Sequence, residues 1–507
     1  MSRINTNVNS LIAQRILGQQ NTSLNKSLER LSTGFRINRG ADDPAGLIAS
    51  EKLRSEKATI GAAIGNAERA DQVVNVAEGG LQEVQGLLLE VQSLVTASAN
   101  DAGLSTEERD ANQLQIDQIL QTIDRISSTT SFQGTKLLNG SFDFQTSGQA
   151  TSVLDFQVDG AKFTDGTNTL VQALVTQSAQ HGSVFLSTAG ALQLDNNAAS
   201  RLAFDVAGAL GSREFSFASG ATAAQIATAI NSFKSSTGVS AATAGTGVQL
   251  KSTGFGSEQF VSVNVDTAPG LAGNTGVYFA SSTDENTVST VAANRTTFAA
   301  ANGAIRDDGQ DVAATINGTT AAGKGLKLAV NTDGLDASIL LNSGAAQAIA
   351  SINAFTITGG GAEFNIGPRV DISNQVRLGI GNIASRNLGT EYVSGVAYNL
   401  DDLGSGKLFD LGDGDLSKSQ DIINSAIDQV SSLRGRLGSF QKNVVGSTIN
   451  SLNVALENIS AAESSIRDTD FASQTAELTR SQILVAAATN TLKIANSQPQ
   501  NVLGLIG

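Results

Sequence analysis

Few residues in this chain could carry acid–base, metal or thiol chemistry. Cysteine is absent, and His181 is the one histidine among 507 residues. One histidine supplies neither a zinc site of the His-Glu-x-x-His type nor a conventional catalytic triad with a histidine base. His181 lies in a loop-like stretch, so we expect it to be a solvent-exposed loop residue. The shortage of histidine and cysteine also disfavours an enzyme within the chain.

Two further segments resemble ligand-binding loops only in part. Residues 323–325 read Gly-Lys-Gly but lack the spacing of a phosphate-binding loop. In Asp413-Gly-Asp415 the other ligand positions of a calcium loop do not fall into place, and a turn before a helix explains this segment better. We therefore expect no enzymatic activity, no cofactor and no metal ion.

Composition narrows the compartment and the partners. The net charge of −14 and the pI near 4.6 argue against non-specific nucleic-acid binding. No apolar run approaches the roughly 20 residues that span a bilayer, so we expect no membrane partner. The N-terminus lacks the apolar core of a secretory signal peptide, which indicates a cytosolic chain or export by a route that cleaves nothing. The length is typical of about three domains.

Apolar periodicity at both ends is the strongest pattern in the sequence. Residues 423–444 carry apolar side chains at alternating spacings of three and four, which is typical of a coiled-coil seam. Residues 4–31 and 74–95 show similar stripes, and 114–126 a shorter one. A helix with one apolar stripe needs a partner in water. The simplest arrangement folds the two ends together and leaves the middle outside; a bundle within one chain, with no further partner, is the alternative.

Local signals place the N-terminal helices. The first stripe predicts a helix over 2–31, and glycines at 34 and 40 predict a connector over 33–40. Asp42-Asp43-Pro44 is typical of a helix start, because a capping carboxylate precedes a proline in the first turn. A second long helix is therefore predicted over 44–95.

Similar signals place the later elements of the helical parts. A Ser-x-x-Glu capping box predicts a helix over 105–128, and a Ser-x-x-Gln box predicts the start of a long helix over 417–467. An Asn-Gly pair predicts a β-hairpin over 136–144. Aspartates at 468 and 470 offer new N-caps, so a last helix is expected to end at about 496.

The middle of the chain has a different texture. Residues 145–363 are rich in Gly, Ala, Ser and Thr and contain short alternating stretches, which indicates small β-rich modules. Residues 223–233 and 345–355 are similar to each other, and each is predicted to form a short helix. This internal similarity suggests two related modules, although alanine-rich helices match by chance fairly easily.

Each end of the chain carries two specific short motifs. They are Glu29-Arg-Leu-Ser-Thr-Gly34 and Asp42-Asp-Pro-Ala-Gly46 near the start, and Ser481-Gln-Ile-Leu484 and Gln498-Pro-Gln-Asn-Val-Leu503 near the end. These motifs resemble the N-terminal and C-terminal signatures of bacterial flagellin. The resemblance extends over 1–144 and 364–507, and residues 222–238 also resemble a short motif from the variable parts of flagellins and hook-associated proteins.

The resemblance implies a fold with a mainly α core of long coiled-coil-like helices from both termini, a β-hairpin region and inserted β-rich (α+β) outer modules. It implies that residues 1–42 and 468–507 form a terminal coiled coil lining the lumen of a helical filament. Residues 43–144 and 364–467 would form a helical bundle with a β-hairpin, and 145–363 a surface-exposed outer region.

The resemblance also implies a function and partners. Such a chain would be a structural subunit that assembles with copies of itself into the extracellular flagellar filament, the propeller for swimming. It would leave the cell through a type III pathway without a cleaved signal peptide, guarded by an export chaperone, and would meet the filament cap and hook-associated proteins. The alternatives are a hook–filament junction protein, a cytoplasmic coiled-coil signalling rod and an enzyme embedded in the outer modules.

Two sets of candidate site residues follow. Alignment with flagellins that an innate immune receptor detects suggests that Glu90 and Gln115 replace an arginine and a glutamate, while Leu94 matches, so receptor activation should be weak. The second set is an assembly seam on the apolar stripes: Leu17, Leu24, Leu28, Leu31, Val74, Leu81, Leu88, Val91, Ile423, Val430, Leu437, Val444, Leu478, Val485 and Leu492.

Overall fold

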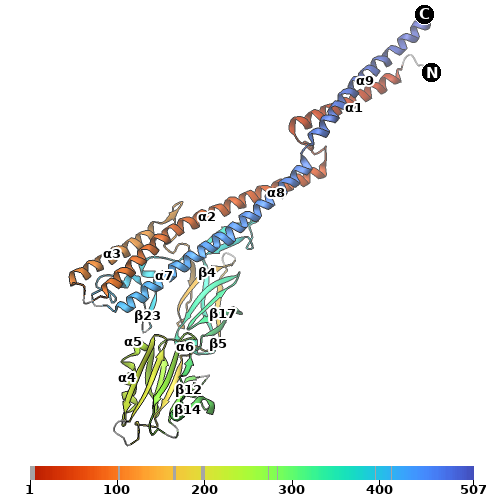
Figure 1. Cartoon of the computed structure of the whole chain (residues 1–507). Coiled ribbons are helices and arrows are strands. Elements are labelled where there is room, and N and C mark those ends of the chain that lie inside the picture. Colours follow the sequence, from red (N-terminus) through yellow and green to blue (C-terminus); the bar gives the residue numbers. More distant parts are fainter. Residues whose placement is uncertain are drawn as a thin grey trace. The chain divides into compact units, whose positions relative to one another are not determined.

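The computed structural model contains two compact units made of discontinuous segments (Figure 1). The first unit comprises Met1–Asn75, Phe364–Gln375 and Arg434–Gly507, and the second comprises Val76–Glu363 and Val376–Leu433. The structure describes residues 6–506, with backbone alone over 499–506, apart from 101–102, 164–166, 196–199, 272, 274, 282–283, 394 and 413.

In the first unit, helices α1 (Val8–Thr33) and α9 (Phe471–Ile506) lie side by side and run antiparallel (Figure 1). The Asn7 side chain caps α1 by accepting the Ser10 N–H, and Gly34 ends it in the left-handed conformation at φ 76°. Helix α9 continues to Ile506 and does not end at about 496 as expected.

The connector after α1 is held by a short backbone ladder. Phe35 pairs with Asp468 in an antiparallel bridge, and the Arg36 N–H donates to the Arg467 carbonyl at 2.7 Å. The Asp468–Asp470 signal is confirmed as a boundary, because Asp470 accepts the Ala472 N–H at the start of α9.

Helix α2 (Pro44–Ser98) begins as the sequence predicts. The Asp43 side chain accepts the Gly46 N–H at 2.9 Å, and Pro44 occupies the first turn. Position 46 leaves little room for a side chain, because a Cβ atom there would lie 2.5 Å from an Asp43 carboxylate oxygen and 2.7 Å from Ile37 Cδ1, and these side chains would have to shift. The start of α2 therefore packs directly on the connector.

Asp42 organises that connector and should make its stability depend on pH. Its carboxylate meets Lys26 Nζ at 2.8 Å and accepts the N–H groups of Asn38 and Arg39. The hydrogen bond from Lys26 is the largest cause that lowers the pKa of Asp42 from 3.8 to about 2. A lowered folded-state pKa stabilises the fold above the unfolded value, and this contribution disappears as pH falls towards 2.

We expect Asp42→Asn to destabilise the connector by about 1 kcal/mol at neutral pH, after allowance for solvent screening of the half-exposed Lys26. The difference from the wild type should vanish near pH 2. Hydrogen exchange of the 36–47 amides at the two pH values measures it. An equal difference at both values would contradict the assignment to the ionised carboxylate.

The long C-terminal helix contains a π-helical turn. It consists of α7 (Leu416–Ser439), the π-helix η5 (Phe440–Gly446) and α8 (Ser447–Arg467). The extra residue in the π-turn moves the buried position from Val444, which is half-buried, to Val445, which is 1% exposed. This shift accounts for the break in apolar spacing before Leu452.

Helix α7 starts one residue earlier than its predicted capping box. Asp415 accepts the Ser417 N–H at 3.0 Å and so acts as the cap, whereas Ser417 lies inside the helix. Within the Asp-Gly-Asp segment, Asp415 therefore caps the helix that follows, and Asp413 lies outside the described residues.

In the second unit, α3 (Thr106–Thr129) packs beside α2 and α7 (Figure 1). The predicted capping box is confirmed, because Ser105 and Glu108 exchange both expected hydrogen bonds. The buried residues of this three-helix bundle include Leu81, Leu88, Ile123 and Ile423.

The β-hairpin lies earlier than predicted. Strands β1 (Ser131–Phe132) and β2 (Thr135–Lys136) pair around Gln133 and Gly134, whose φ angles are 49° and 84°. Two positive φ angles in a two-residue loop match the right-handed twist of the strands. The Asn139-Gly140 pair instead makes a turn in which the Asn139 side chain accepts the Ser141 N–H.

The middle region contains two β-rich modules, each with its own core. The inner module is one antiparallel sheet in the order β3-β20-β5-β16-β17-β18-β19-β4, with Phe355 and Ile339 in its core. Its strands are β3 (Phe144–Ser147), β4 (Val153–Ala161), β5 (Thr169–Gln177), β16 (Ala313–Ile316), β17 (Thr319–Lys324), β18 (Lys327–Asn331), β19 (Leu335–Leu341) and β20 (Ser351–Gly360).

The outer module is inserted into the inner one. One sheet has the strand order β13-β12-β6-β10-β9, and β14 also pairs with β12. The other sheet has the order β15-β11-β7-β8. Phe204 and Ile230 lie in the core that the two sheets share. The strands are β6 (Ser183–Ser187), β7 (Arg201–Gly208), β8 (Gly211–Ala218), β9 (Val239–Ala244), β10 (Gly247–Ser252), β11 (Phe260–Thr267), β12 (Gly276–Ser281), β13 (Asp284–Val288), β14 (Arg295–Thr297) and β15 (Ile305–Asp308).

The two similar segments of the middle adopt different structures. The first forms the predicted helix α4 (Ala223–Asn231), followed by α5 (Lys234–Thr237). The second forms only the short helix α6 (Ser343–Gln347), and from Ser351 it becomes strand β20. Pairing of β20 with β5 overrides the helix preference of an alanine-rich sequence, so the predicted helix over 345–355 is wrong in its second half.

Short strands complete the described chain between the modules and α7: β21 (Ala362–Asn365), β22 (Gln375–Leu378), β23 (Glu391–Val393) and β24 (Val396–Tyr398). Among the described residues, no helix combines the length and apolar character needed to cross a membrane.

Candidate assembly interface

The contact face of the α1/α9 pair is a complete heptad seam. On α9 the predicted leucine and valine positions alternate with buried small residues, in the order Leu478, Ser481, Val485, Ala488, Leu492 and Ala495. On α1 the corresponding buried small residues are Ser10, Ala13 and Ser27, and Leu17, Leu24 and Leu31 are half-buried. Sequence reasoning missed the small residues, although their spacing of seven on α9 was a readable signal.

Polar side chains fix the register of this pair. Asn7 Nδ2 donates to the Ala495 carbonyl at 2.7 Å, and Ser10 Oγ donates to Asn496 Oδ1 at 2.7 Å. At the other end of the pair, Gln474 Nε2 donates to Ser27 Oγ at 2.9 Å. Small residues bring the helix axes close, and these hydrogen bonds hold them in one antiparallel register.

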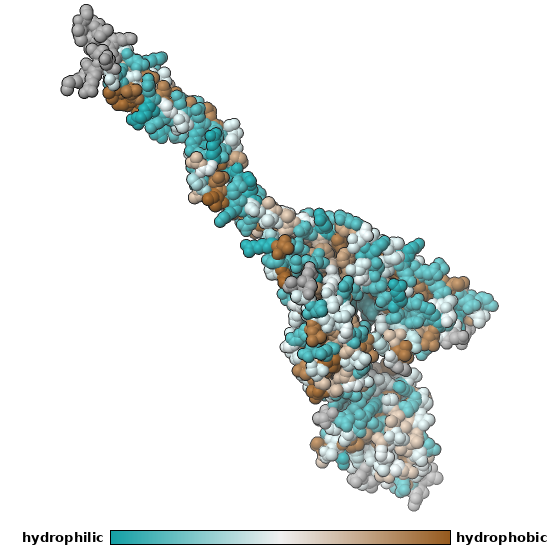
Figure 2. Space-filling view, turned by 180° about the vertical axis from the view of Figure 1, so that it is seen from behind, coloured by the Kyte–Doolittle hydropathy of each residue, from teal (hydrophilic) through white to brown (hydrophobic). Residues whose placement is uncertain are grey.

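The pair leaves much of its apolar surface uncovered. Apolar side chains lie on the surface of this helix pair (Figure 2). Leu11 is 57% exposed, Ile483 64% and Ile494 63%. We call this set the outer apolar surface, and it comprises Val8, Leu11, Ile12, Ile16, Leu28, Phe471, Ile483, Leu484 and Ile494. So many exposed large apolar side chains on one helix pair are typical of a protein–protein contact.

The predicted seam residues of the helix bundle are covered within the chain itself, apart from Val444, which is half-buried. In the bundle, Leu81 and Leu88 on α2 and Val430 on α7 are at most 1% exposed. The other fully buried residues of this group are Val74, Val91, Ile423 and Leu437. A neighbouring copy cannot contact side chains that are buried inside the subunit. The prediction that these residues form an assembly surface is therefore wrong, and they form a subunit core instead.

The predicted receptor residues come together on the bundle. Gln115 Nε2 on α3 donates to Glu90 Oε1 on α2 at 2.7 Å, and both residues are exposed. Leu94 is half-buried beside them on α2. Leu89 precedes Glu90 in the sequence and is 51% exposed, and Leu114 precedes Gln115 and is 63% exposed.

Among the described residues, the few that could carry chemistry are held by neighbouring protein groups. His181 is not the solvent-exposed residue expected: its side chain is 16% exposed, its ring lies 3.7 Å from that of Phe255, and its Nδ1 lies 3.0 Å from the Gly254 carbonyl. Burial lowers the pKa of His181. Lys324 pairs with Glu258, and the described residues hold no cluster of three metal-ligating side chains.

Comparison with known proteins identifies the family. The bacterial flagellin N-terminal helical region matches residues 4–143, the C-terminal helical region 420–506, and the flagellin hook IN motif 202–254. Flagellin B of Helicobacter pylori is 31% identical over 99% of both chains, and flagellin B of Vibrio cholerae is 27% identical over 99% of both. The chain belongs to the bacterial flagellin family.

Among solved structures, FliC from Burkholderia pseudomallei is 15% identical and covers 74% of this chain and 99% of its own, with a TM-score of 0.24. The family assignment therefore rests on the sequence comparisons. This flagellin is a structural subunit of the flagellar filament, an extracellular assembly, and its fold of terminal helices with a β-rich middle is the predicted one.

Proposed function

We propose that this flagellin joins its neighbours in the filament through the outer apolar surface of the α1/α9 pair. The observation that carries the proposal is the exposure of Leu11, Ile483 and Ile494 on helices whose bundle counterparts are buried. Contacts of this kind between copies, repeated head to tail without closing, produce an open filament. The assembly residues we assign are this surface and the half-buried seam leucines of the pair.

The proposal includes a division of the chain. Residues 1–42 and 468–507 line the filament lumen, 43–144 and 364–467 surround them as a bundle, and 145–363 face the solvent. The boundary at 42 is supported by the connector that Asp42 holds, and the boundary at 145 by the change from helices to the inner module. The subunit has a structural role and no catalytic one.

Purified subunits seeded with filament fragments test this function by negative-stain electron microscopy. Long filaments are expected. A stable soluble dimer that never elongates would favour the signalling-rod alternative. If the chain were present in cells at only a few copies per flagellum, it would be a junction protein instead.

Export and capping belong to the same proposal. The apolar surface of α9 would aggregate in the cytoplasm, so an export chaperone covers this helix until the subunit leaves through a type III pathway. No signal peptide is cleaved, and the subunit then meets the filament cap and hook-associated proteins. Subunits from filaments should retain the sequence from the first residues onward in N-terminal mass spectrometry.

Weak activation of an innate immune receptor is our prediction for the Glu90–Gln115 surface. A glutamate in place of an arginine reverses the charge at a contact, and like charges brought together cost several kcal/mol. The double variant Glu90→Arg/Gln115→Glu restores the detected pattern and keeps the helix–helix pair. It should activate a cell-based reporter at least 10-fold more strongly than the wild type. A wild type as potent as a strongly detected flagellin would contradict this prediction.

A further inference from the structure

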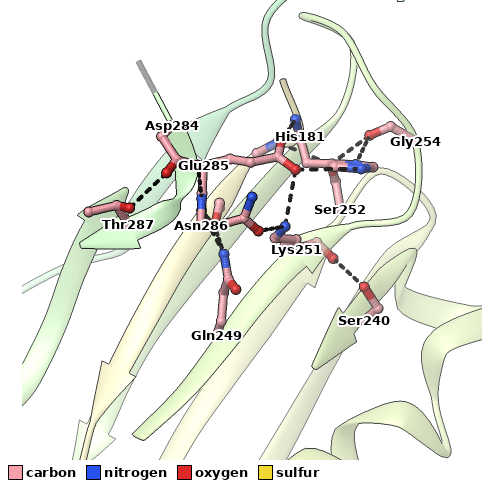
Figure 3. A network of polar contacts seen from close by, with 12 residues as sticks. His181, Ser240, Gln249, Lys251, Ser252, Gly254, Asp284, Glu285, Asn286 and Thr287 are labelled. Atoms are coloured by element: carbon pink, nitrogen blue, oxygen red, sulfur yellow. Dashed lines mark hydrogen bonds and ion pairs between the residues drawn. The ribbon is translucent and has the colours of Figure 1, made fainter. Parts of the chain in front are cut away.

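A buried acid in the outer module touches a lysine that also touches an asparagine (Figure 3). Glu285, at the start of β13, is 5% exposed. Its Oε1 lies 3.0 Å from the Nζ of Lys251, near the end of β10. The same Nζ lies 2.5 Å from Oδ1 of Asn286, the residue after Glu285. An amine, a carboxamide and a buried carboxyl group therefore meet at one point.

The carboxyl group is held in place from several sides. Glu285 Oε2 accepts a hydrogen bond from the backbone N–H of His181 at 2.6 Å. The Glu285 carbonyl accepts hydrogen bonds from Gln249 Nε2 at 2.6 Å and Ser183 Oγ at 3.0 Å. These donors come from β6, β10 and the residues just before β6, so the acid is fixed relative to the strand that carries Lys251 (Figure 3).

Other lysine–carboxylate pairs of the described chain lack this setting. The acid side chain of the Lys162–Asp333 pair is 90% exposed, and that of Lys324–Glu258 is 69% exposed. The Glu285 side chain is 6% exposed and that of Lys251 is 23% exposed. Water screens the first two pairs but has little access to the third.

The contact between Lys251 Nζ and Glu285 Oε1 at 3.0 Å provides a direct path for a proton between the amine and the acid. His181 does not compete as a second cation, because its burial favours the neutral ring. Asn286 is exposed at the edge of the site, so a small leaving group can escape to solvent.

We propose that Lys251 and Asn286 form an intramolecular amide cross-link, with Glu285 carrying the proton. Glu285 accepts a proton from the lysine ammonium, and the neutral Nζ attacks Cγ of Asn286. The Nζ–Cγ bond forms and the Cγ–Nδ2 bond breaks, and the amide nitrogen leaves as ammonia after receiving the proton from Glu285. The second proton of the attacking Nζ passes to the Glu285 carboxylate, so the products are the amide, ammonia and a neutral Glu285 carboxyl group, which releases its proton to solvent or to the departing ammonia. No electrons are exchanged, so no oxidant or reductant is needed.

The cross-link would tie β13 to β10. Strands β12 and β6 lie between them in the sheet, and β13 is an edge strand whose pairing with β12 is irregular. A covalent closure between distant positions restricts the unfolded chain, as a disulfide does. This extracellular subunit has no cysteine, so it cannot use disulfides for that purpose.

Intact mass spectrometry of the full-length protein tests the proposal. The wild type should be lighter than its sequence by one ammonia, and a tryptic digest should contain the Lys251 and Asn286 peptides joined. Lys251→Arg and Glu285→Gln should each restore the full sequence mass. Lys162→Arg, the matched control, should keep the ammonia deficit.

A second variant separates this bond from other losses of ammonia. Asn286→Asp should lose water instead and so reach the same final mass as the cross-linked wild type. A cyclic imide at an Asn-Gly pair would also release ammonia, but it joins no peptides, is cleaved by hydroxylamine and survives Lys251→Arg. A wild-type mass equal to the sequence mass, or a deficit that persists in Lys251→Arg, would overturn the proposal.

Discussion

Filaments are expected to form only at a much higher subunit concentration when Ile483, on the outer apolar surface, is replaced by aspartate. Ile483 is 64% exposed, so Ile483→Asp removes no contact within the subunit. At the interface that we propose, it replaces a buried apolar side chain by a buried charge. This change costs about 3 kcal/mol per subunit, equivalent to a roughly 100-fold rise in the concentration needed for polymerisation.

The measurement is sedimentation of seeded subunits over a range of concentrations, with circular dichroism to verify that the monomer is folded. Leu170→Asp is the matched control, because Leu170 is 47% exposed on β5 of the inner module. Subunits that carry this substitution should assemble normally. Leu492→Asp should also block assembly, but Leu492 is half-buried in the α1/α9 seam, so that variant disturbs the subunit too. Normal filaments from Ile483→Asp would show that the outer apolar surface is not an interface.

Removal of the whole middle region is expected to leave assembly intact. The two ends of the region lie together, because Gly360 pairs with Phe144 and the Gly361 N–H donates to the Asp143 carbonyl at 3.1 Å. A linker of roughly four Gly/Ser residues, each spanning about 3.5 Å, can therefore replace residues 145–363. None of the seam residues lies in this interval.

Electron microscopy should show long, thinner filaments, with a polymerisation threshold within about 3-fold of the wild type. A smaller excision provides the control. Gln180 and Gln310 exchange two backbone hydrogen bonds at 2.8 and 2.9 Å, so replacing 182–309 should remove the outer module and keep the inner one. If the larger excision gives a soluble, exported protein that never polymerises, the middle carries assembly contacts and our division of the chain is wrong.

The local elements of the helical parts could be predicted from the sequence, because the signals that place them are local. The capping carboxylate of Asp43 and the Ser105–Glu108 capping box act within one turn of the helix they start. The shift from heptads to alternating stretches at 145 is likewise a property of neighbouring residues. The same holds for the limited chemistry that a chain without cysteine and with a single histidine can perform.

Errors occurred where pairing with a distant segment decided the outcome. Residues 351–355 have the alanine-rich pattern of a helix, but β5 offers them hydrogen bonds and they form a strand. His181 is polar and lies between strands, yet Phe255 and Glu285 cover it. The hairpin is a local exception: its turn formed at Gln133-Gly134, just after α3, and not at the stronger Asn-Gly signal.

The apolar stripes show most clearly what sequence and tertiary structure each contribute. Periodicity alone determined that 74–95 and 423–444 on one hand, and the terminal helices on the other, each have one apolar face. Only the fold decided that Leu88 and Val430 are sealed inside one chain while Ile483 and Ile494 stay exposed. The physical reason is that an apolar stripe shows which face of a helix must be shielded from water. The surface that covers this face comes from residues hundreds of positions away, or from another molecule.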